Sequence, residues 1–217
     1  MMRQTIGIGM VGLIVSGVAV ASPWSLSVGL GSAIAADARS GARAEIATVR
    51  TACGCAVAGG GPTHAGYGLL ALGYRVSRWI AVQGTAFGEP TFQGALSLSG
   101  GGTTAPATIT DRITGGTLLA LAHHRFAGSW AWAAGAGVAV TRDSESGSIT
   151  VNGVTHTVPA AVTTRVSPAV SASISYALTR RWSVGASYVE ITSVGRQGQQ
   201  YTAGPLGLAS VTGTYTF

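Results

Sequence analysis

The chain has 217 residues, of which 47% are hydrophobic and only 9% are charged, with a formal net charge of +6. It contains no lysine, and its arginines are scattered, which argues against the basic stripe of a nucleic-acid-binding surface. Beyond the first 21 residues no apolar stretch is long enough for a helix to cross a bilayer. Apolar surface without spanning helices must be arranged in strands.

The N-terminal segment has the three parts of a secretory signal peptide. Arg3 lies in a short n-region, an apolar run follows it, and Ala19-Val20-Ala21 provides the small residues before a cleavage site. A membrane anchor is the alternative, but the run is shorter than the roughly 20 residues that a spanning helix needs. We therefore expect residues 1–21 to be removed and residues 22–217 to form one domain.

Two cysteines, Cys53 and Cys55, lie in a long connection predicted over residues 34–63. Export implies an oxidising route, which would allow a disulfide between them, although the ring would be tight. A Cys-x-Cys pair with no histidine or further cysteine nearby is a weak metal site. A membrane strand over residues 43–52, with a partner, would raise the strand count to ten.

Alternation with a period of two predicts eight strands with bulky apolar residues on one face and Ser, Thr, Gly or Ala on the other. In the sixth, for example, Ile174 and Tyr176 alternate with Ser173 and Ser175. The fourth is apolar on both faces, so the pattern leaves its register open. The predicted strands cover residues 23–33, 65–76, 79–90, 112–125, 129–142, 164–178, 182–192 and the run that ends at 217.

The small, hydroxyl-bearing face of these strands decides the architecture. A soluble β-sandwich would leave charged residues outside, whereas this face has almost no charge. Its small residues fit a narrow lumen, and the bulky face fits lipid, where a charge would cost roughly 2 to 4 kcal/mol at the midplane. The prediction is an all-β fold, an eight-stranded antiparallel up-and-down transmembrane β-barrel in the cell outer membrane.

Short and long connections alternate along the chain. Short turns at 76–78, 126–128 and 179–181 would face the periplasm together with both termini, because such barrels place long loops outside. The long connections are 34–63, 91–111, 143–163 and 193–204.

Aromatic residues near the short turns and termini predict a belt at the periplasmic interface. A thinner outer belt would contain Tyr67, Phe87 and Tyr188. The periplasmic belt consists of Trp24, Tyr74, Trp79, Trp130, Trp132, Tyr176, Trp182, Tyr215 and Phe217.

The segments 72–79, 178–185 and Gly213-Thr214-Tyr215-Thr216-Phe217 resemble signatures of the small eight-stranded barrels of the OmpA-like and opacity-protein type. The resemblance spans the mature chain and specifies architecture rather than activity. It implies that Phe217 is read by the barrel-assembly machinery. Two departures are that no peptidoglycan-binding domain follows the barrel and that Thr212 stands where the terminal assembly signal has glycine.

The outer end holds the individual features. Asn152 and Gly153 form a type I′ turn signal, so we expect strands five and six to continue beyond the membrane as a hairpin. Four charged residues occupy positions that the alternation turns inward, toward the lumen or its mouth. They are Arg75, Glu89, Asp143 and Arg165.

These features favour a monomeric, non-enzymatic protein with a structural or surface-interaction role, embedded in outer-membrane lipid and open to an extracellular ligand at its loops. We expect no metal, cofactor or catalytic residue. A narrow pore is the alternative, because a lumen of small residues has few side chains able to plug it. A lipid-modifying enzyme would need a base beside a nucleophile or a carboxylate pair at the outer rim, and His64 and His156 lack such a pattern.

Overall fold

The computed structural model describes residues 23–35, 56–60, 63–100, 103–126, 128–151, 153–194 and 204–217. The predicted leader and both cysteines lie outside these ranges. No helix in this part of the chain has the length and hydropathy needed to cross a membrane. The strands are β1 (Trp24–Ala35), β2 (Ala56–Gly60), β3 (His64–Arg75), β4 (Ile80–Phe87), β5 (Thr91–Gly100), β6 (Thr103–Arg125), β7 (Trp130–Val151), β8 (Val154–Ala177), β9 (Trp182–Val194) and β10 (Gly204–Thr216).

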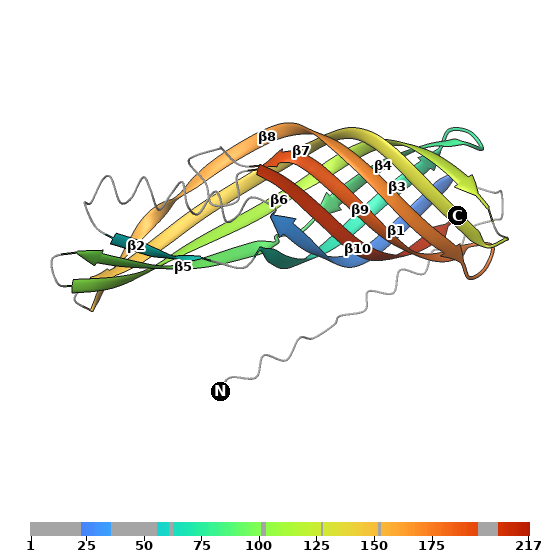
Figure 1. Cartoon of the computed structure of the whole chain (residues 1–217). Helices are drawn as coiled ribbons and strands as arrows, with labels where there is room; N and C mark the ends of the chain where they lie inside the picture. The colour runs from blue at the N-terminus through green and yellow to red at the C-terminus, as the bar shows by residue number, and fades with distance from the viewer. Residues whose placement is uncertain are drawn as a thin grey trace.

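Eight of these strands close into an antiparallel barrel (Figure 1). The order around the ring is β6-β4-β3-β1-β10-β9-β8-β7, and β7 pairs back with β6. β1 pairs directly with β3 along its length, from Trp24 opposite Tyr74 to Ile34 opposite His64. No further strand fits between them. The predicted eight-stranded barrel is therefore confirmed, and the ten-strand alternative is wrong; residues 43–52 themselves lie outside the described ranges.

The short turns form where hydroxyl and glycine residues favour them. Ser77 Oγ accepts hydrogen bonds from the amides of Trp79 and Ile80. Thr179 Oγ1 likewise accepts hydrogen bonds from the amides of Arg181 and Trp182. The third turn contains Gly128 at a φ of 61°, a left-handed conformation that favours glycine. These local bonds compete well with extended structure, so each hairpin reverses in few residues.

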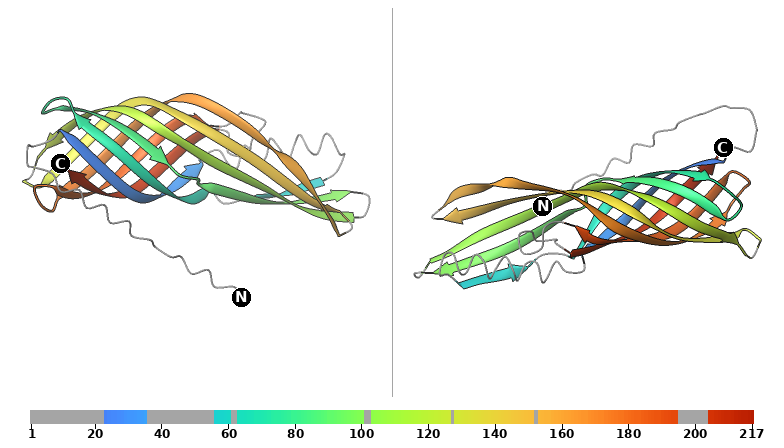
Figure 2. Two further views of the ribbon diagram at one scale, coloured as in Figure 1. Left: turned by 180° about the vertical axis from the view of Figure 1, so that it is seen from behind. Right: turned by 90° about the horizontal axis from the view of Figure 1, so that it is seen from above.

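Three strands of the ring continue far past the barrel (Figures 1 and 2): β6 has 23 residues, β7 has 22 and β8 has 24. β5 pairs with the first part of β6, and β2 pairs with β5. Together they build a five-stranded sheet beyond the barrel, which we call the extension (residues 56–60, 91–100, 103–112, 142–151 and 153–164). The predicted continuation of two strands beyond the membrane as a hairpin is therefore confirmed by β7 and β8. The connection predicted over 91–111 is wrong, because most of these residues are in strands β5 and β6.

The tip of the β7–β8 hairpin lies where the sequence predicts a turn. Val151 pairs with Val154, which leaves a two-residue connection, and Gly153 has a φ of 79°. Asn152 lies outside the described residues. A register shift between Glu145 and Gly147 interrupts the hairpin part-way along, as a β-bulge does.

The outer surface changes character at one level of the sheet. Val140 pairs with Gly116 on one side and with Val166 on the other, and this is the last apolar row. One row further, Arg142 pairs with Thr114 and Thr164. Because charge on a lipid-facing strand is costly, the lipid-facing band ends between these rows and the extension begins there.

Candidate functional site

The aromatic residues predicted near the short turns lie together at that end of the barrel, and most are exposed on its outside. Cross-strand ring contacts connect them: centroids lie 4.8 Å apart for Trp24 and Tyr74 and 5.0 Å apart for Trp182 and Tyr215. His124 extends the series by stacking on Trp79 at 5.1 Å. We call the series the aromatic girdle. It contains the nine residues Trp24, Tyr74, Trp79, Trp130, Trp132, Tyr176, Trp182, Tyr215 and Phe217, together with His124.

The lumen beside the girdle holds a cavity of about 250 Å³, which we call the polar cavity because many of its lining residues are Ser and Thr, with Leu69, Leu119 and Leu121 among the others. Arg75 and His123 lie at the short-turn end of its lining. The hydroxyls of Ser27 and Thr214 lie 2.8 Å apart across two of its strands. This half of the lumen has the small hydroxyl lining that the sequence predicts.

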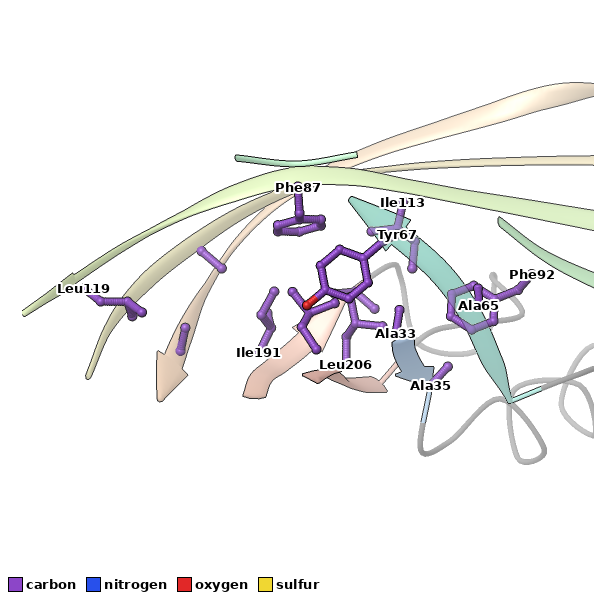
Figure 3. Close-up of a cluster of buried hydrophobic side chains, with 14 residues drawn as sticks. Ala33, Ala35, Ala65, Tyr67, Phe87, Phe92, Ile113, Leu119, Ile191 and Leu206 are labelled. Atoms are coloured by element: carbon purple, nitrogen blue, oxygen red, sulfur yellow. The ribbon is translucent and has the colours of Figure 1, made fainter. Parts of the chain in front are cut away.

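The other half of the lumen is filled with apolar side chains (Figure 3). Tyr67 is 7% exposed and Phe87 is 4% exposed. Their rings meet edge to face, with centroids 6.4 Å apart. All eight strands of the ring contribute to this buried cluster, which we call the plug. It consists of Ala33, Ala35, Ala65, Tyr67, Phe87, Phe92, Ile113, Leu119, Ala139, Ala169, Ile191, Val194, Leu206 and Leu208.

Each of the two rings lies over a glycine of the neighbouring strand. Tyr67 pairs with Gly31 of β1, where a Cβ atom would stand 2.6 Å from the tyrosine ring. Phe87 pairs with Gly115 of β6, where a Cβ atom would stand 2.8 Å from the phenylalanine ring. Because a side chain at either glycine would collide with a ring, these glycines make the space in which the plug packs.

A hydrogen-bond chain fixes the Tyr67 hydroxyl inside the lumen. Its hydroxyl shares a hydrogen bond with the side chain of Ser210 on β10, and the Ser210 hydroxyl lies 2.7 Å from that of Ser187 on β9. The side chain of Tyr67 therefore reaches from β3 past β1 to β10, the second strand along the ring.

The position of Tyr67 and Phe87 corrects two predictions. Tyr67 and Phe87 are buried and do not form an outer belt; of the three predicted belt residues only Tyr188 faces outward. The lumen also contains side chains large enough to plug it. The signal was in the alternation: Tyr67 shares the parity of inward Ala71 and Gly73, and Phe87 shares that of Thr85.

The predicted lumen charges lie at opposite ends of the barrel. Arg75 lies at the short-turn mouth, and Glu89 is exposed in the break between β4 and β5. Asp143 is buried on β7 at the base of the extension. Arg165 is exposed on β8, where it pairs with Thr141. Asp111 is fully buried on β6 near Asp143, and alternation alone could not predict its burial.

The described histidines do not gather with these carboxylates. His156 pairs with Ile149, four residues along β7 from Glu145, which is about 13 Å at the rise of a strand. His64 pairs with Ile34 on β1. In the described ranges no group of three or more His, Cys, Asp or Glu side chains could hold a metal ion.

No protein family model and no curated protein sequence matches the chain. Similar solved structures are small outer-membrane β-barrels. Ail of Yersinia pestis, solved in complex with the heparin analogue sucrose octasulfate, is 11% identical, with 89% of this chain and 97% of Ail covered at a TM-score of 0.46. Neisserial surface protein A is 13% identical, with 90% of this chain and 98% of that protein covered at a TM-score of 0.47. OprG of Pseudomonas aeruginosa is 11% identical, with 90% and 97% covered at 0.47.

The eight-stranded architecture that the predicted resemblance implies is confirmed by the closed ring of strand pairings. Since all three TM-scores lie below 0.5, the assignment to this architecture rests on the closed ring of strand pairings and the apolar outer band. The chain has the architecture of an outer-membrane β-barrel protein.

Proposed function

We propose that the protein is a non-enzymatic surface-interaction protein of the outer membrane that acts through the extension. The observation that carries the proposal is that strands, and not open loops, continue beyond the last lipid-facing row. Paired strands hold a broad surface in one shape, and a preformed surface binds a partner with a smaller loss of conformational entropy than flexible loops would.

The outer face of the extension is suited to contact with an aqueous partner. Hydroxyl pairs cross its strands: Thr108 and Ser148 lie 2.7 Å apart, and Thr150 and Thr155 lie 3.0 Å apart. Arg112 and Arg142 are exposed on the same face. Such a face offers hydrogen-bond donors and acceptors together with positive charge, which favours a polar or anionic extracellular ligand.

The plug argues against the alternative of a narrow pore. Its side chains come from all eight strands of the ring, and several are fully buried. A solute that enters the polar cavity from the short-turn end meets Tyr67 and Phe87. We therefore propose a barrel that anchors and does not conduct.

The orientation follows the rule that outer-membrane barrels keep short turns in the periplasm. Under this rule the aromatic girdle, the start of β1 and the end of β10 would face the periplasm, and the extension would lie outside the cell. An epitope inserted after Gly153 should be labelled on intact cells. An epitope in the turn after Thr179 should be labelled only once the outer membrane is permeabilised. The reverse pattern would overturn the orientation.

A truncation designed from the strand register tests the proposed function. Glu145 pairs with Ala161, so replacement of residues 146–160 by an Asn-Gly turn should close a shorter hairpin. Cells that express the full chain and cells that express this variant are compared for adhesion to immobilised extracellular-matrix proteins and sulfated glycans. We expect lost adhesion with unchanged heat-modifiable gel mobility, which reports the folded barrel.

Replacement of residues 96–107 by Asn-Gly, between the paired Ala95 and Thr108, gives a second truncation on the other side of the extension. Equal adhesion of the full chain and both folded truncations would overturn the proposal.

A further inference from the structure

We propose that the short-turn end of the barrel binds anionic phospholipid headgroups through arginines held on the aromatic girdle. This inference requires only that the barrel lies in a bilayer, and it is independent of what the extension does. The arginines, which we call the collar, are Arg75, Arg78, Arg125, Arg180 and Arg181.

The acidic residues of the described ranges lie at one end of the molecule, whereas arginines lie at both ends. The collar arginines flank the short turns or the lumen mouth, and all four turn-flanking ones are exposed. Every Asp and Glu side chain of the described ranges lies in the half of the molecule away from the short turns. These residues are Glu89, Asp111, Asp143, Glu145 and Glu190. The short-turn rim is therefore strongly positive, with no carboxylate side chain in the described ranges to neutralise it.

Two collar residues are fixed to rings of the girdle. The guanidinium carbon of Arg78 lies 5.3 Å from the ring centroid of Trp79, within the range of a cation–π interaction. On another side of the barrel, Arg181 Nη1 donates a hydrogen bond to the Tyr215 hydroxyl at 3.2 Å. Both rings belong to cross-strand aromatic contacts, so the two guanidinium groups are held in place before any ligand arrives.

The position of the girdle identifies the ligand. Trp and Tyr rings on the outside of a membrane protein lie at the level of the lipid headgroups. Guanidinium groups attached to those rings therefore lie at the depth of the lipid phosphates, and arginine is suited to bidentate phosphate contacts. Because Trp79 is exposed on the outer wall and not in the lumen, the phosphate reached by Arg78 is that of a surrounding lipid.

The test counts lipids that stay with the protein. The full chain is reconstituted in nanodiscs of equal phosphatidylglycerol and phosphatidylcholine, released into a zwitterionic detergent and analysed by native mass spectrometry. The wild-type protein should retain phosphatidylglycerol in preference to phosphatidylcholine. The variant R78Q/R181Q should reduce this preference about tenfold, since each basic residue near an anionic surface adds to its attraction. R78K/R181K, which keeps the charge but loses the bidentate contacts, should give a preference between these two values.

The matched control is R112Q/R142Q, which removes the same charge from two exposed arginines of the extension, away from the girdle. Because Arg142 lies one row beyond the lipid-facing band but no girdle ring holds it, this variant should reduce the preference less than about twofold, against about tenfold for R78Q/R181Q. An equal loss in both double variants, or no preference in the wild type, would overturn the proposal. Release of phosphatidylglycerol by excess inorganic phosphate would also overturn it, because the ligand would then be free phosphate.

Heat-modifiable gel mobility reports whether each variant folds. If R78Q/R181Q fails to fold, R78Q and R181Q are tested singly, and each should reduce the preference for phosphatidylglycerol about threefold.

Discussion

The barrel and the extension are built from the same strands but face their surroundings in opposite ways. On β6, Leu118 points outward in the barrel, whereas Thr108 occupies the outer face ten residues away in the extension. On the inner face the order reverses: Thr117 lies beside the polar cavity, and Ile113 is buried at the base of the extension. The change from lipid to water outside thus occurs within single strands.

This difference shows which part of the wall can carry a function. A lipid-facing surface must stay apolar and uncharged, so it has little freedom to form a specific binding site. The extension has no such restriction, and its hydroxyl pairs and arginines lie where water and ligands have access. Inside the wall, the plug lies between the polar cavity of the barrel and the extension. On the outside, the Val140 row marks the same boundary between barrel and extension.

The first prediction concerns a substitution in the plug, the part of the barrel interior that separates the polar cavity from the extension. Phe87→Ala should lower the free energy of unfolding by about 3 kcal/mol, because truncation of a buried phenylalanine leaves a cavity. Urea unfolding in lipid vesicles, followed by gel mobility, measures the loss. Phe126→Ala, at an exposed turn position, is the control and should lose less than about 1 kcal/mol. Equal losses would mean that Phe87 does not pack as described.

The second prediction tests the outer face of a single strand. Leu118→Arg should cost roughly 2 to 4 kcal/mol in the same assay, because it places a charge in the lipid band. Thr108→Arg, on the same face of β6 in the extension, should change stability by less than about 0.5 kcal/mol. A similar cost at both positions would show that the lipid band does not end at the Val140 row.

The third prediction concerns the space beside Tyr67. Gly31→Ala should destabilise the barrel by about 1 to 3 kcal/mol, since the new methyl group meets both the tyrosine ring and the backbone carbonyl oxygen of Ala209. Gly84→Ala is the matched substitution, because a Cβ atom there has no neighbour within 4 Å. It should be neutral or slightly stabilising. A neutral Gly31→Ala would contradict the cross-strand packing.

The smallest effect is expected for the outer hydroxyl pairs of the extension. Thr108→Ala and Ser148→Ala, combined in a double-mutant cycle, should give a coupling energy of about 0.5 kcal/mol, because exposed hydrogen bonds compete with water. A coupling above about 2 kcal/mol would indicate that this pair is shielded from solvent.

The sequence predicts the membrane part of the fold well, because lipid imposes alternation on most strands; the membrane part of β6, which is apolar on both faces, is the exception. In β8 and β9, for instance, residues from Ile174 to Tyr188 show it without interruption apart from the turn at 178–181. The turns are equally predictable from Ser77, Thr179 and Gly128, which satisfy local backbone requirements.

The extension and the plug are harder to predict for physical reasons. Strand β5 alternates Phe92 and Leu96 with small or polar residues. Its apolar face is turned inward and its other face does not meet lipid, so a strand search based on lipid-facing residues assigns this segment to a loop. The plug depends on which inward glycines face an aromatic ring, and that requires the register between β1 and β3. Parity alone places Tyr67 inside, but only the pairing with Gly31 explains how its ring fits.

The central claim, a plugged barrel that anchors an extension, is tested most directly by single-channel conductance in planar bilayers. The wild-type protein should show no current steps above baseline, and the folded variant Tyr67→Gly/Phe87→Gly should show discrete steps, because it removes both rings that close the polar cavity. Steps of equal size from the wild type and the variant would contradict the claim.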